Sequence, residues 1–557
     1  MTQTGDSAGE PTAGEPSATG VGAARAIAST LRSTLGPNGL DTMVIDRSGT
    51  VTVTNTGATV LDGLSIDTPI GRVIEEAVRT HARRVGDGTT TTALLIGGLL
   101  DEADRLVEAG LHPTSIAAGY VSAADHARDV LRDRSVPIDP GGERLRQAAA
   151  TAVTGRWDAA ATERFAALTV GALRAVDLDP ARLTVHAYAG GELADSELID
   201  GILVDVDDSS TTIDGVAADD RRSLSDPTIA LVDSEIRLPD VDASGSVTVR
   251  NPDDLAAVRD HERTNRGELI RAVTDVEVDA LVCQQSIDDD IGTALARAGV
   301  LPVERTRRDE FDAIARAADA TPVAAVADLD REALGTAGAI RRRKVGGGNV
   351  LTISEFPGES HVSLLLRGGT PHVAEETRRI VEDGIAVVRH ATAGGVVPGG
   401  GAGMIAVSRA VTDRASSVDD RSALALEAFA DAVTVIPRTL ARNAGVDPID
   451  ALAELRNRHH DGERTAGIDP SGTVRDVFAV GVIEPVAVPA RCLETAARTA
   501  GLVIRIDERL DGESTGGSGI DGSSRERGRA HAGDHVHSDG DDHGGGHDGG
   551  YPWALSH

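Results

Sequence analysis

The chain is 557 residues long, too long for one ordinary domain, and its length suggests roughly three or four domains. Apolar residues make up 40% of the composition but aromatic residues only 2%, so the cores must be built from Ala, Val, Leu and Ile. The formal net charge of -33, with Lys344 as the single lysine, disfavours binding to nucleic acid and to anionic membranes and indicates an acidic, salt-adapted protein.

The two ends of the chain differ from the rest in composition. Residues 1–19 are rich in Ser, Thr, Gly, Glu and Pro and have no apolar core, which predicts a disordered arm and no signal peptide. Residues 509–557 are dominated by Gly, Asp, His and Ser, which predicts a disordered tail. Its histidines could hold Zn²⁺, Ni²⁺ or Cu²⁺ loosely, but their irregular spacing favours a solvated tail. These histidines are His531, His535, His537, His543 and His547.

The segment 20–142 shows the apolar period of helices, interrupted by a hairpin pattern. One apolar stripe runs from Ala24 to Leu35 and another from Leu95 to Val107, and each predicts an amphipathic helix. Between them, Met43–Asp46 and Val51–Thr54 flank a short polar turn and predict the two strands of a hairpin.

From about Gly201 to Ser360 short apolar runs alternate with helical stretches, which predicts an α/β domain. Helical pattern returns after a strand-like run at Val362–Leu366. The fold class expected is therefore multi-domain α+β, with a mainly helical domain interrupted by an α/β insertion. The apolar runs are Ile202–Val206, Ile229–Val232, Ala280–Cys283 and Val350–Ile353.

The most informative stretch for function is Gly86-Asp87-Gly88-Thr89-Thr90-Thr91-Thr92, directly before an apolar helix. Free backbone N–H groups at a helix start attract anions, glycines let a phosphate approach the backbone, threonine hydroxyls add donors, and an aspartate can hold Mg²⁺. The stretch indicates a phosphate site. A capped helix with a glycine-rich start stays open as the alternative on this segment alone.

Two further glycine loops could belong to the same site. Leu35-Gly36-Pro37-Asn38-Gly39 ends the first helix and could close over the phosphates, and Gly399-Gly400-Gly401 precedes another helix and could let a nucleotide ring lie against backbone. Alone, each is simply a turn or a tight helix start. None is a Walker A loop, because no Gly-Lys-Ser/Thr follows.

Seven segments in their usual order make the chain resemble the group II chaperonin (thermosome) family of archaea, from about residue 20 to 508. They are Thr34-Leu35-Gly36-Pro37, Gly86-Asp87-Gly88-Thr89-Thr90-Thr91, His112-Pro113-Thr114 with Gly119-Tyr120, Leu366-Arg367-Gly368-Gly369-Thr370, Gly399-Gly400-Gly401-Ala402, Ile436-Pro437-Arg438-Thr439-Leu440 with Asn443-Ala444-Gly445, and Ala466-Gly467-Ile468-Asp469.

The resemblance implies an ATP-dependent chaperonin subunit that binds unfolded protein and assists its folding inside a double ring of eight-membered type. It implies an equatorial domain that binds ATP, a small intermediate domain that transmits the nucleotide state, and an apical domain that closes a lid over the captured protein. The implied boundaries are 20–142 and 398–508 for the equatorial domain, 143–200 and 361–397 for the intermediate domain, and 201–360 for the apical domain.

Functional roles follow from the same resemblance. Asp87 would ligate Mg²⁺, Gly400 would border the base and Glu484 would contact the ribose. Asp383 matches the family's catalytic aspartate on the intermediate domain, whereas without the resemblance it would be a solvated helix acid. The residues expected to hold ATP and its phosphates are Thr34, Leu35, Gly36, Pro37, Asp87, Gly88, Thr89, Thr90, Thr91, Gly400 and Glu484.

One departure concerns hydrolysis directly. The family usually has Asn-Asp-Gly where this chain has Asn55-Thr56-Gly57, so a second carboxylate near the attacking water is missing. A threonine can hydrogen-bond that water but carries no charge, and losing one positioned acid or base lowers a rate by on the order of 10² to 10⁴. We therefore expect ATP to bind and its hydrolysis to be slow or dependent on neighbouring subunits. Asn38 also replaces a usual lysine.

Partners and location are expected from the same sequence. Ser244–Gly267, where the family grips its clients, is mostly polar, so the grip should be weak or polar. The resemblance implies that Val503–Ile506 forms a strand that pairs with the hairpin of the adjacent subunit, in a ring of one or several kinds of subunit. Cys283 and Cys492 match no disulfide or metal pattern, which favours a reducing cytoplasm.

Two alternatives are carried forward. The first is a nucleotide-binding but hydrolysis-weak accessory or regulatory subunit of a mixed ring, which Thr56 and the polar apical segment would favour. The second is an unrelated small-molecule kinase or nucleotide enzyme, for which the sequence offers no substrate motif.

Overall fold

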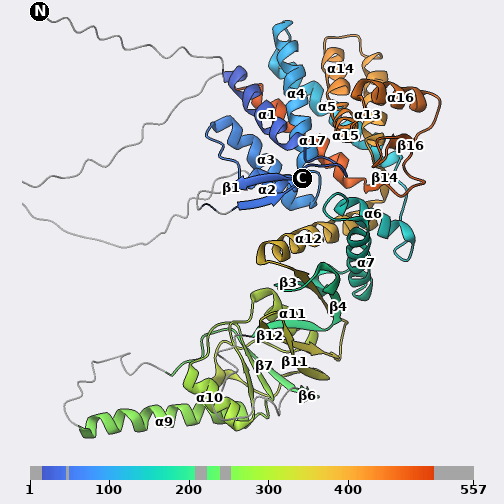
Figure 1. Ribbon diagram of the computed structural model, residues 1–557. Helices are drawn as coiled ribbons and strands as arrows, with labels where there is room; N and C mark the ends of the chain where they lie inside the picture. Colours follow the sequence, from blue (N-terminus) through green and yellow to red (C-terminus); the bar gives the residue numbers. More distant parts are fainter. Residues whose placement is uncertain (1–15, 46–48, 50, 207–222, 239–251, 507–557) are drawn as a thin grey trace, which may run out of the picture. The chain divides into compact units, whose positions relative to one another are not determined.

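The computed structural model describes residues 16–45, 49, 51–206, 223–238 and 252–506 (Figure 1). The first helix, α1 (Pro16–Arg32), begins inside the predicted arm, so the last residues of that arm are helical. Proline is suited to this position because its missing N–H would have no partner in the first turn of a helix. The rest of the arm and the predicted tail 509–557, with its histidines, lie outside the described residues.

Helices from both ends of the chain pack side by side: α1, α4 (Thr89–Glu108), α5 (Pro113–Asp133) and α17 (Ala487–Val503) (Figure 1). Glycines allow the close approach. A Cβ atom added at Gly97 of α4 would lie 2.9 Å from the Cβ of Ala28 on α1, and one at Gly119 of α5 would lie 2.5 Å from the Cβ of Ala425. Small residues at helix contacts thus let a chain with few aromatic residues fill this core.

The remaining elements of this helical part are short. They are α2 (Gly57–Asp62), α3 (Pro69–Val85), α13 (Ala402–Ala415), α14 (Ser422–Ala432), α15 (Val435–Asn443), α16 (Pro448–His460), and the strand pairs β14 (Val396–Pro398) with β17 (Ile483–Pro485) and β15 (Ala466–Ile468) with β16 (Val474–Asp476).

The predicted hairpin is confirmed. Strands β1 (Thr42–Ile45) and β2 (Val51–Thr54) pair antiparallel, with Met43 opposite Val53. Asp46, which was expected to end the first strand, lies outside the described residues. One face of this ribbon is open: Met43 is 64% exposed and Val53 57%.

The strand predicted at Val503–Ile506 is wrong in this structure. Helix α17 continues through Val503, and residues 504–506 form a turn. The side chains of Val503 and Ile504 are buried in the helical core. Because a strand needs a neighbouring edge for its backbone hydrogen bonds, and Val503 and Ile504 already pack onto the core here, the segment takes the local structure that satisfies its backbone.

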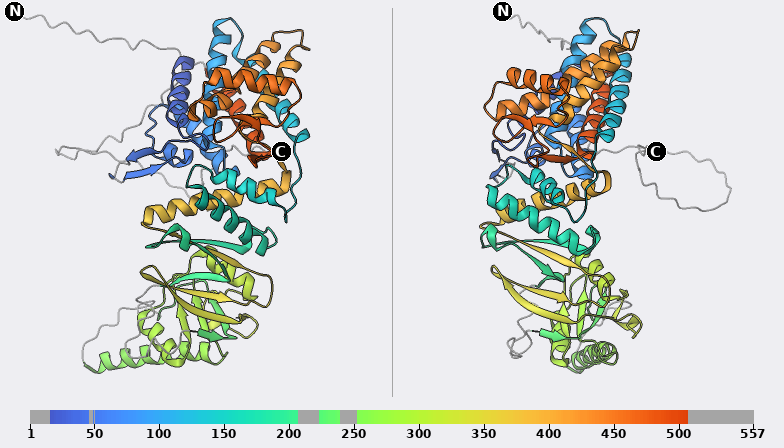
Figure 2. Two further views of the ribbon diagram at one scale, coloured as in Figure 1. Left: turned by 45° about the vertical axis from the view of Figure 1, so that its right-hand side comes forward. Right: turned by 90° about the vertical axis from the view of Figure 1, so that its right-hand side faces the viewer.

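A three-stranded sheet lies next along the chain. Strand β13 (Val362–Gly368) is central, parallel to β3 (Leu183–Ala189) and antiparallel to β4 (Glu197–Asp200). Helix α12 (Pro371–Gly394) packs on β3 and β13, and α6 (Glu143–Val153) and α7 (Ala159–Ala175) pack on α12 (Figure 2). Residues on either side of the α/β insertion therefore build one sheet.

The insertion itself holds two four-stranded sheets. One has the order β10-β7-β8-β9, in which β7, β8 and β9 run parallel, and the other has the antiparallel order β5-β12-β11-β6. Their elements are β5 (Ile202–Val206), β6 (Ser223–Ser225), β7 (Thr228–Val232), α9 (Pro252–Thr274), β8 (Ala280–Cys283), α10 (Asp289–Ala298), β9 (Leu301–Val303), α11 (Arg308–Ala318), β10 (Gly335–Thr336), β11 (Ala339–Val345) and β12 (Gly348–Ser354).

The apolar runs singled out in the sequence are all strands. Ile202–Val206 and Ala280–Cys283 coincide with β5 and β8, Ile229–Val232 lies within β7, Val350–Ile353 within β12 and Val362–Leu366 within β13. The α/β character of the insertion is therefore confirmed. Within the described part of the chain, no helix is both long enough and apolar enough to span a bilayer.

Candidate functional site

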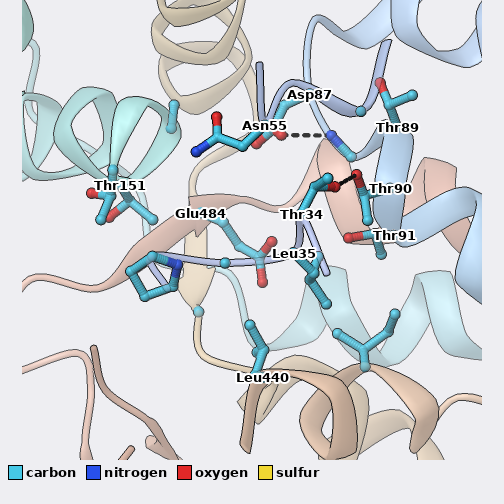
Figure 3. Close-up of a pocket in the computed structure, with 18 of the residues that line it drawn as sticks. Thr34, Leu35, Asn55, Asp87, Thr89, Thr90, Thr91, Thr151, Leu440 and Glu484 are labelled. Carbon is cyan, nitrogen blue, oxygen red and sulfur yellow. Dashed lines mark hydrogen bonds between the residues drawn. The ribbon is translucent and has the colours of Figure 1, made fainter. Parts of the chain in front are cut away.

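A cavity of about 250 Å³ collects the predicted site residues (Figure 3). Its wall is built by the loop after α1, the start of α4, helix α12, the loop before α13 and strand β17, elements drawn from both halves of the chain. Every predicted residue lines it: Thr34, Leu35, Gly36, Pro37, Asp87, Gly88, Thr89, Thr90, Thr91, Asp383, Gly400 and Glu484.

The start of α4 carries free backbone donors toward this cavity. Gly88, with φ of 82°, is the residue before the helix, and among the described residues no side chain caps the first turn. The amide of Gly88 donates to the carboxylate of Asp87 at 2.6 Å. Thr92 is the first residue of the helix whose N–H reaches a carbonyl, that of Gly88. The capped-helix alternative is therefore not what forms, and the amides of Thr89–Thr91 remain available to an anion.

His81 and Cys492 contact the backbone of the loop Gly86–Gly88 that precedes α4. The Nε2 atom of His81 lies 2.9 Å from the carbonyl oxygen of Asp87, so this nitrogen carries the proton and donates. Burial lowers the pKa of His81 to about 4, although the Asp87 carbonyl acts to raise it. The Sγ atom of Cys492 lies 3.5 Å from the Gly88 carbonyl oxygen. A Cβ atom at Gly88 would lie 2.5 Å from that sulfur, so both glycine geometry and close contact fix the loop.

The loop after α1 is tied to the same helix start. The hydroxyls of Thr34 and Thr90 lie 3.1 Å apart, and a dashed line in Figure 3 joins them. Gly36 has φ of 81° and approaches the side chain of Leu440. Asn38, which stands where the family has lysine, donates its amide to the Pro470 carbonyl at 2.8 Å and so serves as a loop tie.

Asp383 reaches the cavity from α12. Gly86 packs directly on this helix: a Cβ atom there would lie 2.6 Å from the Cβ of Ala386 and 3.6 Å from the Cα of Asp383. Burial, and then the nearby carboxylate of Asp87, raise the pKa of Asp383 to about 8. Asp383 is therefore a half-buried group of the site rather than a solvated surface acid.

Arg156 was missed by the sequence reasoning. It lines the cavity in the loop between α6 and α7, and its guanidinium donates to the side chain of Asn55. Burial lowers its pKa, while the carboxylates of Asp87, Glu376 and Asp383 act in the opposite direction. The only signal in the sequence was an arginine within Thr154-Gly155-Arg156, which matches no motif that reasoning from the residues uses.

Glu376 was also missed, and it meets the residue that departs from the family pattern. The hydroxyls of Thr54 and Thr56 each donate to Oε1 of Glu376 at 2.8 Å. Thr56 is 7% exposed, so this hydrogen bond is shielded from solvent. The position of the missing carboxylate is thus occupied by a hydroxyl that is bound to a carboxylate from α12.

Gly400 and Glu484 line the same cavity from the loop before α13 and from β17. Gly400 has φ of 58°, and a Cβ atom there would lie 2.4 Å from the carbonyl oxygen of Ile468, so only glycine fits. Glu484 sits on β17 opposite Val397 of β14. Burial, and then Asp87, raise the pKa of Glu484 to about 8. Figure 3 shows its carboxylate among the labelled cavity residues.

The residues present fit a magnesium nucleotide. Unclaimed amides and threonine hydroxyls supply donors for phosphate oxygens, and Arg156 supplies a positive charge. Asp87, Asp383 and Glu484 supply carboxylate oxygens, the ligand type that Mg²⁺ prefers. Burial and then the carboxylate of Asp87 raise the pKa values of Asp383 and Glu484, and a bound cation would favour their ionised forms.

Comparison with known proteins yields one consistent group. Residues 27–511 match the model of the TCP-1/cpn60 chaperonin family. The chain is 38% identical to "Thermosome subunit alpha" of Halobacterium salinarum over 503 residues, which are 89% of this chain and 88% of that one. It is 37% identical to "Thermosome subunit 1" of Haloferax volcanii (90% of each chain) and 37% identical to "Thermosome subunit" of Methanopyrus kandleri (87% of this chain and 90% of that one).

The contact between His81 and the loop before α4 can be tested through the pH dependence of unfolding. Since its pKa is about 4 in the folded chain and near 6.5 in the unfolded chain, the unfolded chain binds the extra proton between these values. The stability contribution is therefore complete above pH 6.5 and is lost as the pH falls. Between pH 7.5 and about pH 5 the loss from His81 should be about 2 kcal/mol. Denaturant unfolding at both pH values should show a pH dependence smaller by that amount in His81→Gln.

The matched control is His460→Gln, which changes an exposed histidine at the end of α16. It should leave the pH dependence of wild-type unfolding unchanged. An equal pH dependence in wild type and His81→Gln would contradict a buried, neutral His81 beneath the loop.

Proposed function

The chain belongs to the TCP-1/cpn60 chaperonin family, and from that premise we propose how its cavity serves an ATP-dependent chaperonin subunit of the group II, thermosome type. The subunit binds unfolded protein and assists its folding. The observation that carries the proposal is the row of unclaimed amides at the start of α4, which faces Asp87, Arg156 and Asp383 across one cavity.

The proposed nucleotide contacts follow from the donors and acceptors in place. The amides and hydroxyls of Thr89–Thr91, with the loop Thr34–Pro37, hold the phosphates. Arg156 adds a guanidinium to them. Asp87 is the group that would hold Mg²⁺, whose chemistry is to neutralise phosphate charge when bound. Gly400 offers bare backbone to the base, and Glu484 offers its carboxylate to the ribose.

For hydrolysis, Asp383 is proposed as the carboxylate that orients the attacking water. Thr56 cannot supply a second charge there. Its hydroxyl proton is directed to Glu376, so its oxygen lone pairs remain to accept a hydrogen bond from that water. We therefore propose an ATPase whose turnover is slow because the second carboxylate acts only through a hydroxyl.

The proposed domain division keeps the boundaries expected from the sequence. The pairing of β13 with both β3 and β4 supports one intermediate domain made of 143–200 and 361–397. The packing of α1, α4 and α5 on α17 supports one equatorial domain made of 20–142 and 398–508. The two four-stranded sheets support an apical domain over 201–360.

The open face of the β1–β2 ribbon supports assembly into a ring. Its exposed apolar side chains would be covered by a neighbouring subunit, and a double ring of eight subunits each is the proposed form. Among residues 201–206, 223–238 and 259–360, the parts of this domain whose side chains the structure describes, no large apolar side chain is exposed, and we propose a polar or weak grip on clients. The segment 239–251 lies outside the described residues. A cytoplasmic location fits the two buried free thiols, Cys283 and Cys492.

Neither alternative function is favoured. The family match over residues 27–511 rules against an unrelated small-molecule kinase. An accessory, hydrolysis-weak subunit is not favoured either, since the relatives reported above are all named as thermosome subunits. Only the rate of ATP hydrolysis remains open from that alternative. The contact between Thr56 and Glu376 allows this rate to be tested.

Calorimetry of the assembled particle with ATP and Mg²⁺ tests the site. Wild type should take up nucleotide, and Asp87→Asn and Arg156→Gln should each weaken binding by about tenfold or more, because a charge-assisted contact contributes about 1.5–3 kcal/mol. Matched controls are Asp133→Asn and Arg132→Gln, two exposed residues that do not line the cavity, and both variants should bind nucleotide as wild type does. No uptake of nucleotide by intact wild-type particles would remove the proposal.

Phosphate release tests the slow turnover. Thr56→Asp alone should raise the rate only slightly, because the new carboxylate would face Glu376 and like charges raise each other's pKa. Thr56→Asp combined with Glu376→Gln should raise the steady-state rate by about tenfold or more. Glu376→Gln alone is the control and should give no increase. Rapid wild-type turnover that Thr56→Asp leaves unchanged would contradict this account.

The hairpin tests ring formation. Met43→Glu with Val53→Glu places two charges on the open face, where burial of each apolar side chain would contribute about 1.5–3 kcal/mol. Electron microscopy and light scattering should show loss of rings while circular dichroism shows folded subunits. Met43→Leu with Val53→Ile keeps the face apolar and should keep the rings. Intact rings in the charged variant would exclude this face from the interface.

A further inference from the structure

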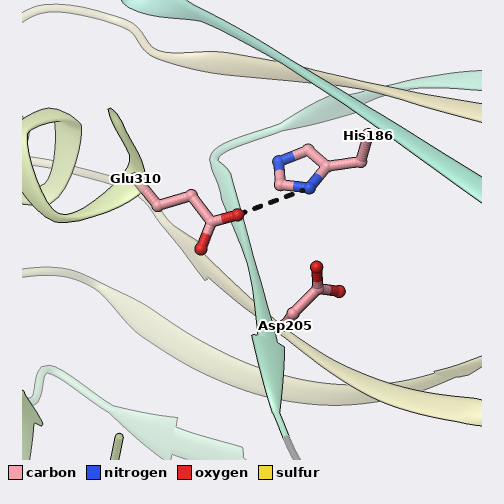
Figure 4. Close-up of side chains that lie close together, drawn as sticks. All are labelled: His186, Asp205 and Glu310. Atoms are coloured by element: carbon pink, nitrogen blue, oxygen red, sulfur yellow. Dashed lines mark ion pairs between the residues drawn. The ribbon is translucent and has the colours of Figure 1, made fainter. Parts of the chain in front are cut away.

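Three side chains from separate elements converge far from the nucleotide cavity. They are His186 on β3, Asp205 on β5 and Glu310 on α11 (Figure 4). One ligand atom from each lies within 4.8 Å of the others. No motif in the sequence links them, since the fold alone brings them together.

Two of the three are buried without hydrogen-bond partners. His186 is 2% exposed and Glu310 is 0% exposed. Both ring nitrogens of His186 and both carboxylate oxygens of Glu310 lack a hydrogen bond within the described part of the chain. Buried polar side chains are nearly always satisfied, and each unsatisfied one destabilises a fold by about 1–3 kcal/mol. Four unsatisfied atoms on two facing side chains indicate that a ligand binds between them.

A direct ion pair does not account for them. The Nδ1 atom of His186 lies 3.6 Å from Oε1 of Glu310, beyond hydrogen-bond distance, as the dashed line in Figure 4 marks. Arg307 approaches Oε1 of Glu310 at 3.5 Å, but its guanidinium donates two hydrogen bonds to Asp309. The carboxylate of Glu310 therefore faces His186 across a gap.

We propose that His186, Asp205 and Glu310 bind a divalent transition-metal ion, for which Zn²⁺ is the best fit. One imidazole nitrogen and two carboxylates are ligands that Zn²⁺ accepts, and three protein ligands leave one position for water. Two ligand atoms that each lie about 2.1 Å from a tetrahedral ion are about 3.4 Å apart. The observed 3.6 Å between His186 and Glu310 matches that separation.

The surroundings support the ligands and give the ion access. The hydroxyl of Tyr188 donates to Asp205, and the Tyr188 ring is parallel to the His186 ring with centroids 6.3 Å apart. A hydrogen-bonded carboxylate beside an oriented imidazole is the support that metal ligands usually have. Asp205 is exposed, so an ion can arrive from solvent at its side of the site and the carboxylate can turn toward it.

The position of the site gives it a consequence for movement. His186 lies in the proposed intermediate domain, and Asp205 and Glu310 lie in the proposed apical domain, so an ion would tie the two together. This consequence rests on the proposed domain boundaries. The metal site itself does not, because it rests only on the three side chains.

The test measures bound metal in the full-length chain. The tail histidines would also bind metal, so the background protein carries asparagine in place of all six. Equilibrium dialysis with Zn²⁺ and visible absorption with Co²⁺ as a probe should report one equivalent per chain in this background. His186→Gln and Glu310→Gln should each weaken binding by about tenfold or more and remove the Co²⁺ absorption bands. The six are His531, His535, His537, His543, His547 and His557.

A matched control separates the site from general effects of buried histidines. His361 is also buried, with its Nε2 atom unpartnered, but it is not part of the cluster, so His361→Gln should keep the full equivalent. Asp205→Asn changes an exposed ligand and Tyr188→Phe removes the hydroxyl that supports it. Because neither variant alters a buried ligand, both should fold, and each should weaken Zn²⁺ binding by about tenfold. Absence of the equivalent in the background protein, or its persistence in His186→Gln and Asp205→Asn, would overturn the proposal. Nucleotide binding measured on the same samples keeps this outcome separate from failure of the ATP site.

Discussion

The structure depends on one constraint: the backbone amides at the start of α4, which no side chain in the described part of the chain satisfies. An N–H group kept from water without a partner destabilises a fold, so a helix that begins this way needs an anion or water at its first turn. The surrounding elements keep that turn open. Gly88 takes a left-handed conformation, His81 holds the Asp87 carbonyl, and Cys492 fills the space behind. The loop is rigid and uncapped, which suits an anion that arrives and leaves.

Charge is the second half of the same constraint. Asp87, Asp383 and Glu484 face one cavity, with the half-buried Arg156 as the cation near them. Carboxylates that share a poorly solvated space resist ionisation, and the raised pKa values of Asp383 and Glu484 express this. A metal-bound triphosphate supplies both a cation for the acids and an anion for the amides. The proposed ligand is therefore the metal and the triphosphate together rather than either component alone.

Sequence reasoning located secondary structure where neighbouring residues carry the signal: a helix start after Gly88 and the strand cores of the α/β insertion. The Gly86–Thr92 stretch and the strand cores at Ile202–Val206 and Ala280–Cys283 were visible because neighbouring residues carry the whole signal. Arg156 and Glu376 were missed because their roles depend on residues about 100 and 320 positions away, at Asn55 and Thr56.

Two strand assignments also mark the limits of local pattern. Strand β11 was not predicted, since its run Arg341-Arg342-Arg343-Lys344 shows charge where a strand signal would show apolar residues. Strand β11 is held in the sheet by its pairing with β12 and β6, so its exposed side chains can be charged. At Val503–Ile506 the error went the other way: an apolar run resembled a strand, but its side chains complete the core at the end of α17.

Helix α12 shows how the cavity and the α/β insertion are mechanically connected. Glu376 and Asp383 are seven residues apart on this helix, which is two turns on one face and about 10 Å along its axis. Glu376 contacts Thr56, and the helix contacts the Gly86 loop at Asp383. Because both contacts are made by one helix, they move together. The chain enters α12 directly from β13, and β13 is paired with β3, where Leu365 lies opposite His186. Any group that fixes His186 to β5 and α11 therefore restrains the strand that leads into the helix carrying Asp383. The connection runs through the paired strands β3 and β13 and the continuous helix α12.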